Sequence, residues 1–278
     1  MNANKELELK KFAARVRIAT LTSIKSRGFG HVGGCLSSAD AIAALYSGVM
    51  NIDPKNPHDI NRDKLVCSKG HAGPLIYATL ALSDFFSEDL LLTLNQPKTK
   101  LPSHCDKHLQ GIDATTGSLG QGTSTAVGIA LADKLQNRDC RTFLLVGDGE
   151  LNEGQCWEAA MFTAGKKINN LTWIIDWNKK QLDGTLDQIL PQFDLEDKFI
   201  SFGFEVVTVD GHDIATIYDE LSKKATEKPR AIILDSIKGC GVNEVEQTEY
   251  NHSMNVDNEV FDRWIAEVQN NLEKLENI

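Results

Sequence analysis

The chain has 278 residues, 41% of them hydrophobic and 24% charged, which suits one α/β domain with a substantial core. Its formal net charge of -10 at pH 7 argues against a broad basic surface for nucleic acid or for an anionic membrane. An anionic ligand stays compatible with this charge, because backbone amides and a metal ion can neutralise a phosphate locally.

At the amino terminus, residues 1–6 are polar and charged, unlike a signal peptide. No apolar run in the sequence approaches the roughly 18 residues of a transmembrane helix. The six cysteines are irregularly spaced and form no C-x-x-C pair, so free thiols in a reducing compartment are expected. We therefore expect a cytoplasmic protein without a membrane anchor.

Seven segments have the apolar period of an amphipathic helix, namely 7–25, 38–49, 72–82, 124–135, 154–164, 214–225 and 258–275. In the second, Ser37 or Ser38 is expected to cap the first turn. Five short apolar segments have the character of strands, namely 65–67, 142–146, 172–176, 205–209 and 231–235. Strands and helices alternate from about residue 64 to 235, which predicts a parallel sheet with helices on both faces. Ligands of such folds lie past the carboxyl ends of the strands.

The strongest chemical signal is Gly147-Asp148-Gly149 after one predicted strand, followed by Asn178 after the next. Asp148 and Asn178 would emerge at adjacent strand ends and could share one ion. Carboxylate, amide and main-chain carbonyl oxygens suit Mg²⁺ or Ca²⁺, with diphosphate oxygens completing the shell. Gly149 would let its backbone N–H approach a phosphate. Asp-Gly is also a common turn dipeptide, but the paired Asn178 favours the metal site.

Five blocks carry these residues in a fixed order. They are GHVGG at 30–34, KLVCSKGH at 64–71, TTGSLGQG at 115–122, GDGELNEG at 147–154, and IDWNK at 175–179 with LDG at 182–184. Together they resemble the transketolase family over about residues 10 to 255. The resemblance implies the parallel α/β fold that binds thiamine diphosphate, with Mg²⁺ or Ca²⁺ holding the diphosphate.

The resemblance also implies roles for individual residues. The metal ligands would be Asp148, Asn178 and the backbone carbonyl of Lys180. The cofactor would be contacted by His71, Gly117, Ser118, Leu119, Gly149, Glu153, Asn178 and His252. His31, His104 and His252 would be catalytic, because histidines donate to sugar hydroxyls and move protons near neutral pH. A lone histidine is more often structural, and Glu153 also suits the first turn of a helix.

A full-length transketolase carries further domains, and one of them supplies the glutamate that activates the aminopyrimidine ring of the cofactor. Residues 1–278 are expected to form a single domain. The resemblance therefore implies a separate C-terminal subunit in an α2β2 assembly, which transfers a two-carbon ketol unit from a ketose phosphate to an aldose phosphate. Val32 and Ser118 stand where the family often has proline, and serine at 118 looks like the split form.

Two alternatives remain compatible with the sequence. The first is a subunit of a related carboligase, either one similar to deoxyxylulose-phosphate synthase or a specialised sugar transketolase. The second is a non-catalytic module that only binds the cofactor, although such a module has no need of His31 and His104.

Overall fold

The computed structural model of the chain describes residues 1–224 and 226–278. Five parallel strands form one sheet in the order β2-β3-β4-β6-β5, and two short strands, β1 and β7, form a second, antiparallel sheet. The strands are β1 (Phe29–Gly30), β2 (Lys64–Cys67), β3 (Thr142–Gly147), β4 (Leu171–Trp177), β5 (Glu205–Asp210), β6 (Arg230–Asp235) and β7 (Met254–Asn255). The α-helices are α1 (Ala3–Lys25), α2 (Val32–Leu36), α3 (Ala39–Ala44), α4 (Gly73–Leu82), α5 (Gln121–Leu135), α6 (Gly154–Gly165), α7 (Leu186–Ile189), α8 (Leu195–Phe202), α9 (Ile214–Ser222), α10 (Asn243–Gln247) and α11 (Asn258–Glu276). Tighter or wider helical turns are η1 (Leu45–Val49), η2 (Gly70–Ala72), η3 (Glu88–Thr93) and η4 (Gly149–Asn152).

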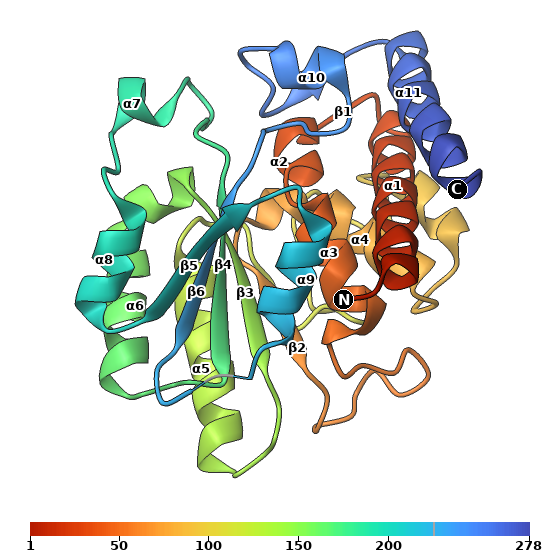
Figure 1. Cartoon of the computed structure of the whole chain (residues 1–278). Coiled ribbons are helices and arrows are strands. Elements are labelled where there is room, and N and C mark those ends of the chain that lie inside the picture. Colours follow the sequence, from red (N-terminus) through yellow and green to blue (C-terminus); the bar gives the residue numbers. More distant parts are fainter. Residues whose placement is uncertain (225) are drawn as a thin grey trace.

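The five-stranded sheet is covered on both faces, as Figure 1 shows. Alternate residues of a strand point to opposite faces, and β3 illustrates this period of two. Phe143 and Leu145 pack in the core under α1, α3, α4, α9 and α11, whereas Leu144 and Val146 pack in the core under α5, α6 and α8. Every residue of β3 is buried, so the sheet forms the middle layer of a three-layer α/β fold.

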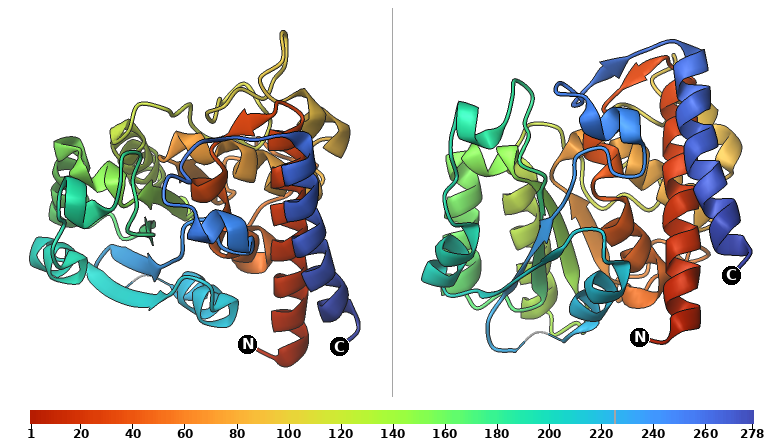
Figure 2. Two further views of the ribbon diagram at one scale, coloured as in Figure 1. Left: turned by 90° about the horizontal axis from the view of Figure 1, so that it is seen from above. Right: turned by 45° about the horizontal axis from the view of Figure 1, so that its top comes forward.

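The two ends of the chain lie together on one side of the sheet. The long helices α1 and α11 run side by side in both views of Figure 2. Phe261 and Trp264 of α11 are buried in the core that these helices share. Near the same region, β1 pairs with β7 through Phe29↔Asn255 and Gly30↔Met254, which ties the amino-terminal part of the chain to the carboxyl-terminal part.

The predicted parallel sheet with helices on both faces is confirmed, and each predicted strand and helix has a counterpart. The prediction of one helix over 38–49 is wrong in detail, because α3 ends at Ala44 and the wider turn η1 follows, in which Gly48 has a φ of +130°. Ser38 occupies the N-cap position of α3, as one of the two predicted alternatives has it, but its side chain makes no capping hydrogen bond. Helix α9 ends at Ser222, and Ala225, the predicted end of that helix, lies outside the described residues. Several short elements were not predicted, namely β1, β7, α2, α7, α8 and α10.

Two findings bear on the environment of the protein. No helix among residues 1–224 and 226–278 is long and apolar enough to cross a bilayer. All six cysteines lie in the described part of the chain, and each is a free thiol.

Candidate active site

The carboxyl ends of β3 and β4 place the first predicted metal ligand. Asp148 follows β3 directly and is almost fully buried. Its carboxylate accepts hydrogen bonds from the backbone N–H groups of Gly149 at 2.7 Å and Lys179 at 2.5 Å. Burial, and then the charge of Asp176, raise the pKa of Asp148 to about 7. A divalent cation beside this carboxylate would offset both effects, so the position suits a metal ligand.

The other two predicted ligands lie in the segment after β4. Asn178 is buried, and its amide nitrogen donates to Asp176 at 2.9 Å. The amide oxygen of Asn178 accepts from the backbone N–H of Lys180 at 3.2 Å. The carbonyl of Lys180 accepts from the ammonium of Lys238 at 2.9 Å. An amide oxygen and a peptide carbonyl thus stand near the buried carboxylate, the donor set that Mg²⁺ and Ca²⁺ prefer.

These ligands share the wall of a cavity of about 150 Å³. The predicted residues on that wall are His71, Leu119, Asp148, Gly149, Asn178, Lys180 and His252. Gly149 has no room for a side chain, because a Cβ there would lie 2.9 Å from the Cβ of Gln181. The cavity therefore combines oxygen ligands for a cation, a glycine backbone and two imidazoles, which fits a metal-bound diphosphate.

The four histidines singled out from the sequence form one cluster beside this cavity. The centroid of the His31 ring lies 5.4 Å from that of His71, 5.8 Å from His104 and 5.2 Å from His252. The rings of His71 and His252 are 4.7 Å apart. Burial lowers the pKa of all four, to about 4 for His31 and about 3 for His252. Their imidazoles are neutral near pH 7 and can each donate and accept a hydrogen bond.

The loop of residues 115–120 approaches the cluster from another side. A Cβ on Gly117 would lie 3.5 Å from the imidazole of His104, so the backbone of this loop passes close to the ring. Leu119 reaches the cavity wall, whereas Ser118 is exposed and, like Gly117, lies outside the cavity lining. The structure thus brings the loop to the site, with only one of its three predicted residues on the wall.

Glu153 is the predicted site residue that stands apart. It is exposed at the start of α6 and lies outside the cavity lining. The neighbouring Glu150, which the sequence did not single out, is buried instead. Its carboxylate accepts from the hydroxyl of Ser68 at 2.5 Å and from the backbone N–H of Gly120 at 2.7 Å. Glu150 therefore fastens the loop of residues 115–120 to the end of β3.

Lys238 is a further site residue that sequence reasoning missed. It lies after β6, is nearly fully buried and lines the cavity. Its ammonium reaches the carbonyl of Lys180 at 2.9 Å and lies 3.3 Å from Nδ1 of His252. Burial lowers its pKa to about 8. Its place after a predicted strand was the available signal, because that is where ligands of a parallel sheet gather.

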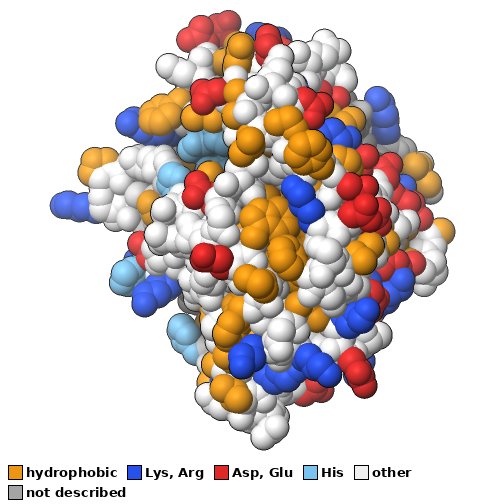
Figure 3. Space-filling view, turned by 90° about the vertical axis from the view of Figure 1, so that its left-hand side faces the viewer, with side chains coloured by type: hydrophobic (Ala, Val, Ile, Leu, Met, Phe, Trp, Pro, Cys, Tyr) orange, Lys and Arg blue, Asp and Glu red, His pale blue; other side chains and the backbone are white. Residues whose placement is uncertain are grey.

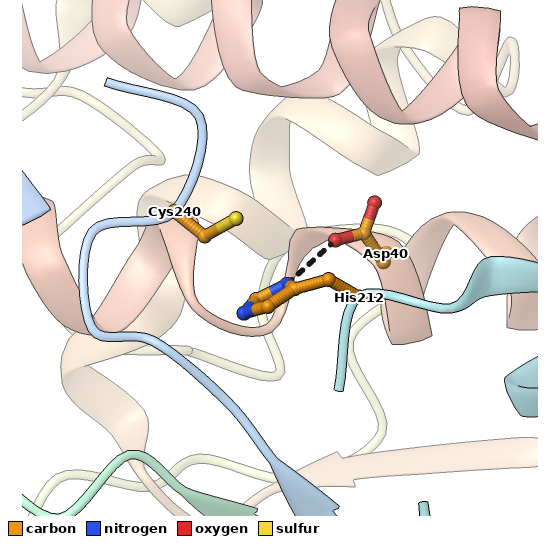
Figure 4. Close-up of side chains that lie close together, drawn as sticks. All are labelled: Asp40, His212 and Cys240. Carbon is orange, nitrogen blue, oxygen red and sulfur yellow. Dashed lines mark hydrogen bonds and ion pairs between the residues drawn. The ribbon is translucent and has the colours of Figure 1, made fainter. Parts of the chain in front are cut away.

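A second group of potential metal ligands lies outside this cavity. Asp40, His212 and Cys240 lie close together, and Figure 4 shows the imidazole directed at the carboxylate. Both oxygens of Asp40 already accept from the guanidinium of Arg17, at 3.0 and 2.5 Å. His212 donates from Nδ1 to Asp40 at 3.1 Å and accepts at Nε2 from the backbone N–H of Ile237 at 2.8 Å. With these groups engaged and a guanidinium adjacent, the cluster is a structural network and is unsuited to a cation.

Comparison with known protein families gives the site its context. Residues 9–268 match the family described as transketolase, thiamine diphosphate binding domain. The chain belongs to this family. The parallel sheet and the thiamine-diphosphate-binding character expected from the sequence are thereby confirmed.

Curated relatives include chains of similar length. The chain is 45% identical to a 6-deoxy-6-sulfo-D-fructose transketolase subunit from Clostridium, over 96% of this chain and 98% of that one. It is 39% identical to an apulose-4-phosphate transketolase subunit from Actinobacillus succinogenes, over 92% of this chain and 93% of that one.

Longer members of the family also match. The crystal structure of a transketolase from Campylobacter jejuni superposes on the chain with a TM-score of 0.85 at 28% identity, covering 100% of this chain and 48% of that one. Human transketolase is 35% identical over 97% of this chain and 43% of its own length. The chain therefore spans less than half the length of these longer relatives.

Proposed function

We propose that the chain is the thiamine-diphosphate-binding subunit of a two-chain transketolase. Together with a separate C-terminal subunit, it would transfer a two-carbon ketol unit from a ketose phosphate to an aldose phosphate. One observation carries the proposal: three oxygen ligands and two imidazoles share one buried cavity in a chain of the transketolase family. Relatives of similar length are named as transketolase subunits, which supports a division of the enzyme between two chains.

The metal would be held by the carboxylate of Asp148, the amide oxygen of Asn178 and the carbonyl of Lys180. Mg²⁺ fits this donor set, and Ca²⁺ fits it as well. Lys238 would move from the carbonyl of Lys180 toward the phosphate oxygens once a cation takes its place. The metal ion would thus replace the ammonium of Lys238 at the carbonyl of Lys180, and the diphosphate would add negative charge to the cavity.

His71, His252 and the backbone N–H of Gly149 would bind the diphosphate. The backbone around Gly117, Ser118 and Leu119 would lie along the rings of the cofactor. Glu153, exposed at the start of α6, would act through contact with the partner chain. Bound thiamine diphosphate supplies a nucleophilic thiazolium carbon, which is the chemistry that the protein itself lacks.

His31, His104 and His252 would orient the sugar and move its protons. Their pKa values are lowered by burial, so each ring is neutral at pH 7 and can accept a hydrogen bond from a sugar hydroxyl or donate one to it. The ring contacts of His31 with the other three would keep the proton carriers within one cluster. This arrangement favours catalysis over mere storage of the cofactor.

The partner would be a separate C-terminal transketolase subunit with the pyrimidine-binding domain and its activating glutamate. Residues 1–278 would act as one domain within an α2β2 assembly. Free cysteines support a reducing, cytoplasmic setting for this assembly.

The decisive experiment combines binding with reconstitution. Asp148→Ala and Asn178→Ala should each abolish Mg²⁺-dependent binding of thiamine diphosphate, measured by calorimetric titration, because each removes an oxygen ligand from a cation with strict geometry. Asp183→Ala, an exposed change in the same segment, is the matched control and should bind normally. Ketol transfer should appear only when the wild-type chain is mixed with the C-terminal subunit of the same organism. Turnover by the purified chain alone, or normal binding by either ligand variant, would refute the proposal.

A further inference from the structure

Asp176, in β4, forms a buried hydrogen-bonding centre directly behind the proposed metal site. Its side chain is fully buried and is not part of the cavity wall, so it does not contact a ligand in the cavity. Its carboxylate accepts from the ammonium of Lys69 at 2.5 Å, from the hydroxyl of Ser37 at 2.7 Å and from the amide of Asn178 at 2.9 Å. The hydroxyl of Ser236 donates to its other oxygen.

These donors come from separate parts of the fold. Ser37 lies between α2 and α3, Lys69 follows β2, and Ser236 follows β6. Lys69 is itself 1% exposed and also donates to the hydroxyl of Ser38 at 3.0 Å. The hydroxyl of Ser38 is thus a partner of Lys69, and it makes no capping hydrogen bond to α3. A carboxylate held by donors from four segments has no freedom to rotate, so it offers a fixed acceptor to its neighbours.

The fixed acceptor determines how the amide of Asn178 can point. The two ends of an amide differ, since the oxygen only accepts and the NH₂ group only donates. Because the NH₂ group donates to Asp176, the oxygen faces the other way. There it accepts a hydrogen bond from the backbone N–H of Lys180 at 3.2 Å, which favours the same orientation of the amide. In the reverse orientation, two oxygens would face each other at Asp176 and the NH₂ group would face the cation.

We propose that Asp176 is a positioning residue, which locks the amide of Asn178 with its oxygen toward the metal. This inference rests on the proposed function, in which Asn178 is a metal ligand. A carboxylate is suited to the task because it only accepts, whereas an amide or hydroxyl in its place could also donate and would permit the flipped amide. Replacing a residue that holds a metal ligand in position by a hydrogen bond typically lowers metal affinity by about 10–100-fold.

The test measures thiamine diphosphate binding to the chain by calorimetric titration, once with Mg²⁺ and once with Ca²⁺. Asp176→Asn keeps the size of the side chain and removes its acceptor-only character. We expect affinity with Mg²⁺ to fall about 10–100-fold and affinity with Ca²⁺ to fall clearly less, because Ca²⁺ tolerates irregular ligand geometry and Mg²⁺ demands an octahedron. Asp235→Asn, at the end of the neighbouring strand and paired with the exposed Lys179, is the matched control and should change neither affinity.

A double variant tests whether Asp176 acts through Asn178. The comparison uses Ca²⁺, because Asn178→Ala is expected to leave no Mg²⁺-dependent binding to compare. If Asp176 acts through Asn178, Asp176→Asn combined with Asn178→Ala should bind no more weakly with Ca²⁺ than Asn178→Ala alone. Equal losses with both metals, or a double variant much weaker than Asn178→Ala, would overturn the inference and leave the proposed function standing. Absence of metal-dependent binding in the wild-type chain would overturn the metal site itself, and this inference with it.

A second variant covers the case in which Asp176→Asn does not fold. Lys69→Met combined with Asp176→Leu replaces the buried ion pair by apolar side chains, an exchange that folded proteins often tolerate. The variant still lacks the acceptor for Asn178, so the same selective loss of Mg²⁺-supported binding is expected. A folded variant with an unchanged ratio of Mg²⁺-supported to Ca²⁺-supported affinity would contradict the proposal.

Discussion

Four neutral histidines beside the cavity make the stability of the cofactor-free chain depend on pH. An unfolded histidine has a pKa of about 6.5, whereas burial lowers that of His31 to about 4 and that of His252 to about 3. Between pH 6.5 and 4, the unfolded chain therefore binds more protons than the folded chain does. Stability contributed by the neutral rings is complete above pH 6.5 and is lost as the pH falls toward 4.

Thermal unfolding between pH 7.5 and 4.5 checks this dependence. His252→Gln should lose less stability on acidification than the wild type, with a slope smaller by up to about 1.4 kcal/mol per pH unit. His58→Gln is the control, because His58 is exposed and lies outside the cluster. Identical pH profiles for the wild type and His252→Gln would show that this ring does not resist protonation.

The histidines should differ in their effects on turnover and on cofactor binding. With the partner present, His31→Ala and His104→Ala should lower the rate by about 10²–10⁴-fold at saturating thiamine diphosphate, because they would relay protons of the sugar. His71→Ala, on the cavity wall, should mainly weaken cofactor affinity. Steady-state kinetics at several cofactor concentrations separate the two effects. Full rescue of His31→Ala by excess cofactor would assign it to cofactor binding.

Single residues were predictable where strand order determined their place. Asp148 and Asn178 follow consecutive strands of a parallel sheet, so their convergence followed from the alternation of elements in the sequence. Lys238 and Glu150 were missed for a different reason. A buried lysine or glutamate is indistinguishable from an exposed one in a single sequence, and its burial depends on donors that arrive from distant segments.

At the scale of elements, one close contact joins two of the motif-bearing segments. Gly70 of η2 lies against the loop of residues 115–120, and a Cβ on it would lie 2.8 Å from the backbone nitrogen of Gly117. Gly70→Ala should therefore destabilise the chain by about 1–3 kcal/mol, since backbone has to move to make room. The same displacement separates His71 from the loop, so cofactor affinity should fall as well.

Chemical denaturation and calorimetry of the two glycine variants provide the measurement. Gly128→Ala is the matched control, because Gly128 is exposed in α5 and a Cβ there meets nothing within 4 Å. Alanine in that helix should stabilise the chain by about 0.5–1 kcal/mol. A neutral Gly70→Ala would mean that the two segments are less closely packed than the structure shows.

The long elements were predictable because their apolar periods extend over several turns. Helix α8 has usable local signals of its own, namely Asp194 as a cap that accepts from Asp197, and Gly203 with a φ of +102° after its end. The non-helical residues within the predicted helix over 38–49 are Ser47 and Gly48, and an isolated glycine is weak evidence for a helix end. Strands β1 and β7 have two residues each, and their pairing joins distant parts of the chain, so no local pattern could reveal them.

At the scale of the whole molecule, exposed apolar side chains support assembly with other chains. Met161 and Phe162 on α6 and Phe193 before α8 are exposed, the last to 84%. Figure 3 looks at the side on which these helices lie and shows hydrophobic surface there. Large apolar groups on the surface often mark contacts with other proteins.

We expect the active enzyme to contain two copies of this chain and two of its partner. Each cofactor would lie between a diphosphate-binding and a pyrimidine-binding domain, so both chains are needed to complete a site. Light scattering coupled to size-exclusion chromatography should give the mass of an α2β2 particle for the mixture. A fully active particle with one copy of each chain would contradict this stoichiometry.

The small sheet of β1 and β7 has a consequence for the order of events during synthesis. His31 follows β1 and His252 precedes β7, so the pairing of these strands brings the two rings together from opposite ends of the sequence. Pairings between such distant segments form late, because the chain between them must first be ordered. A nascent chain on the ribosome can build helices and the first strands of the large sheet, but it has no complete histidine cluster until the last segments have emerged. We therefore expect thiamine diphosphate to bind after translation is finished, as a ligand of the completed chain and not as a nucleus for its folding.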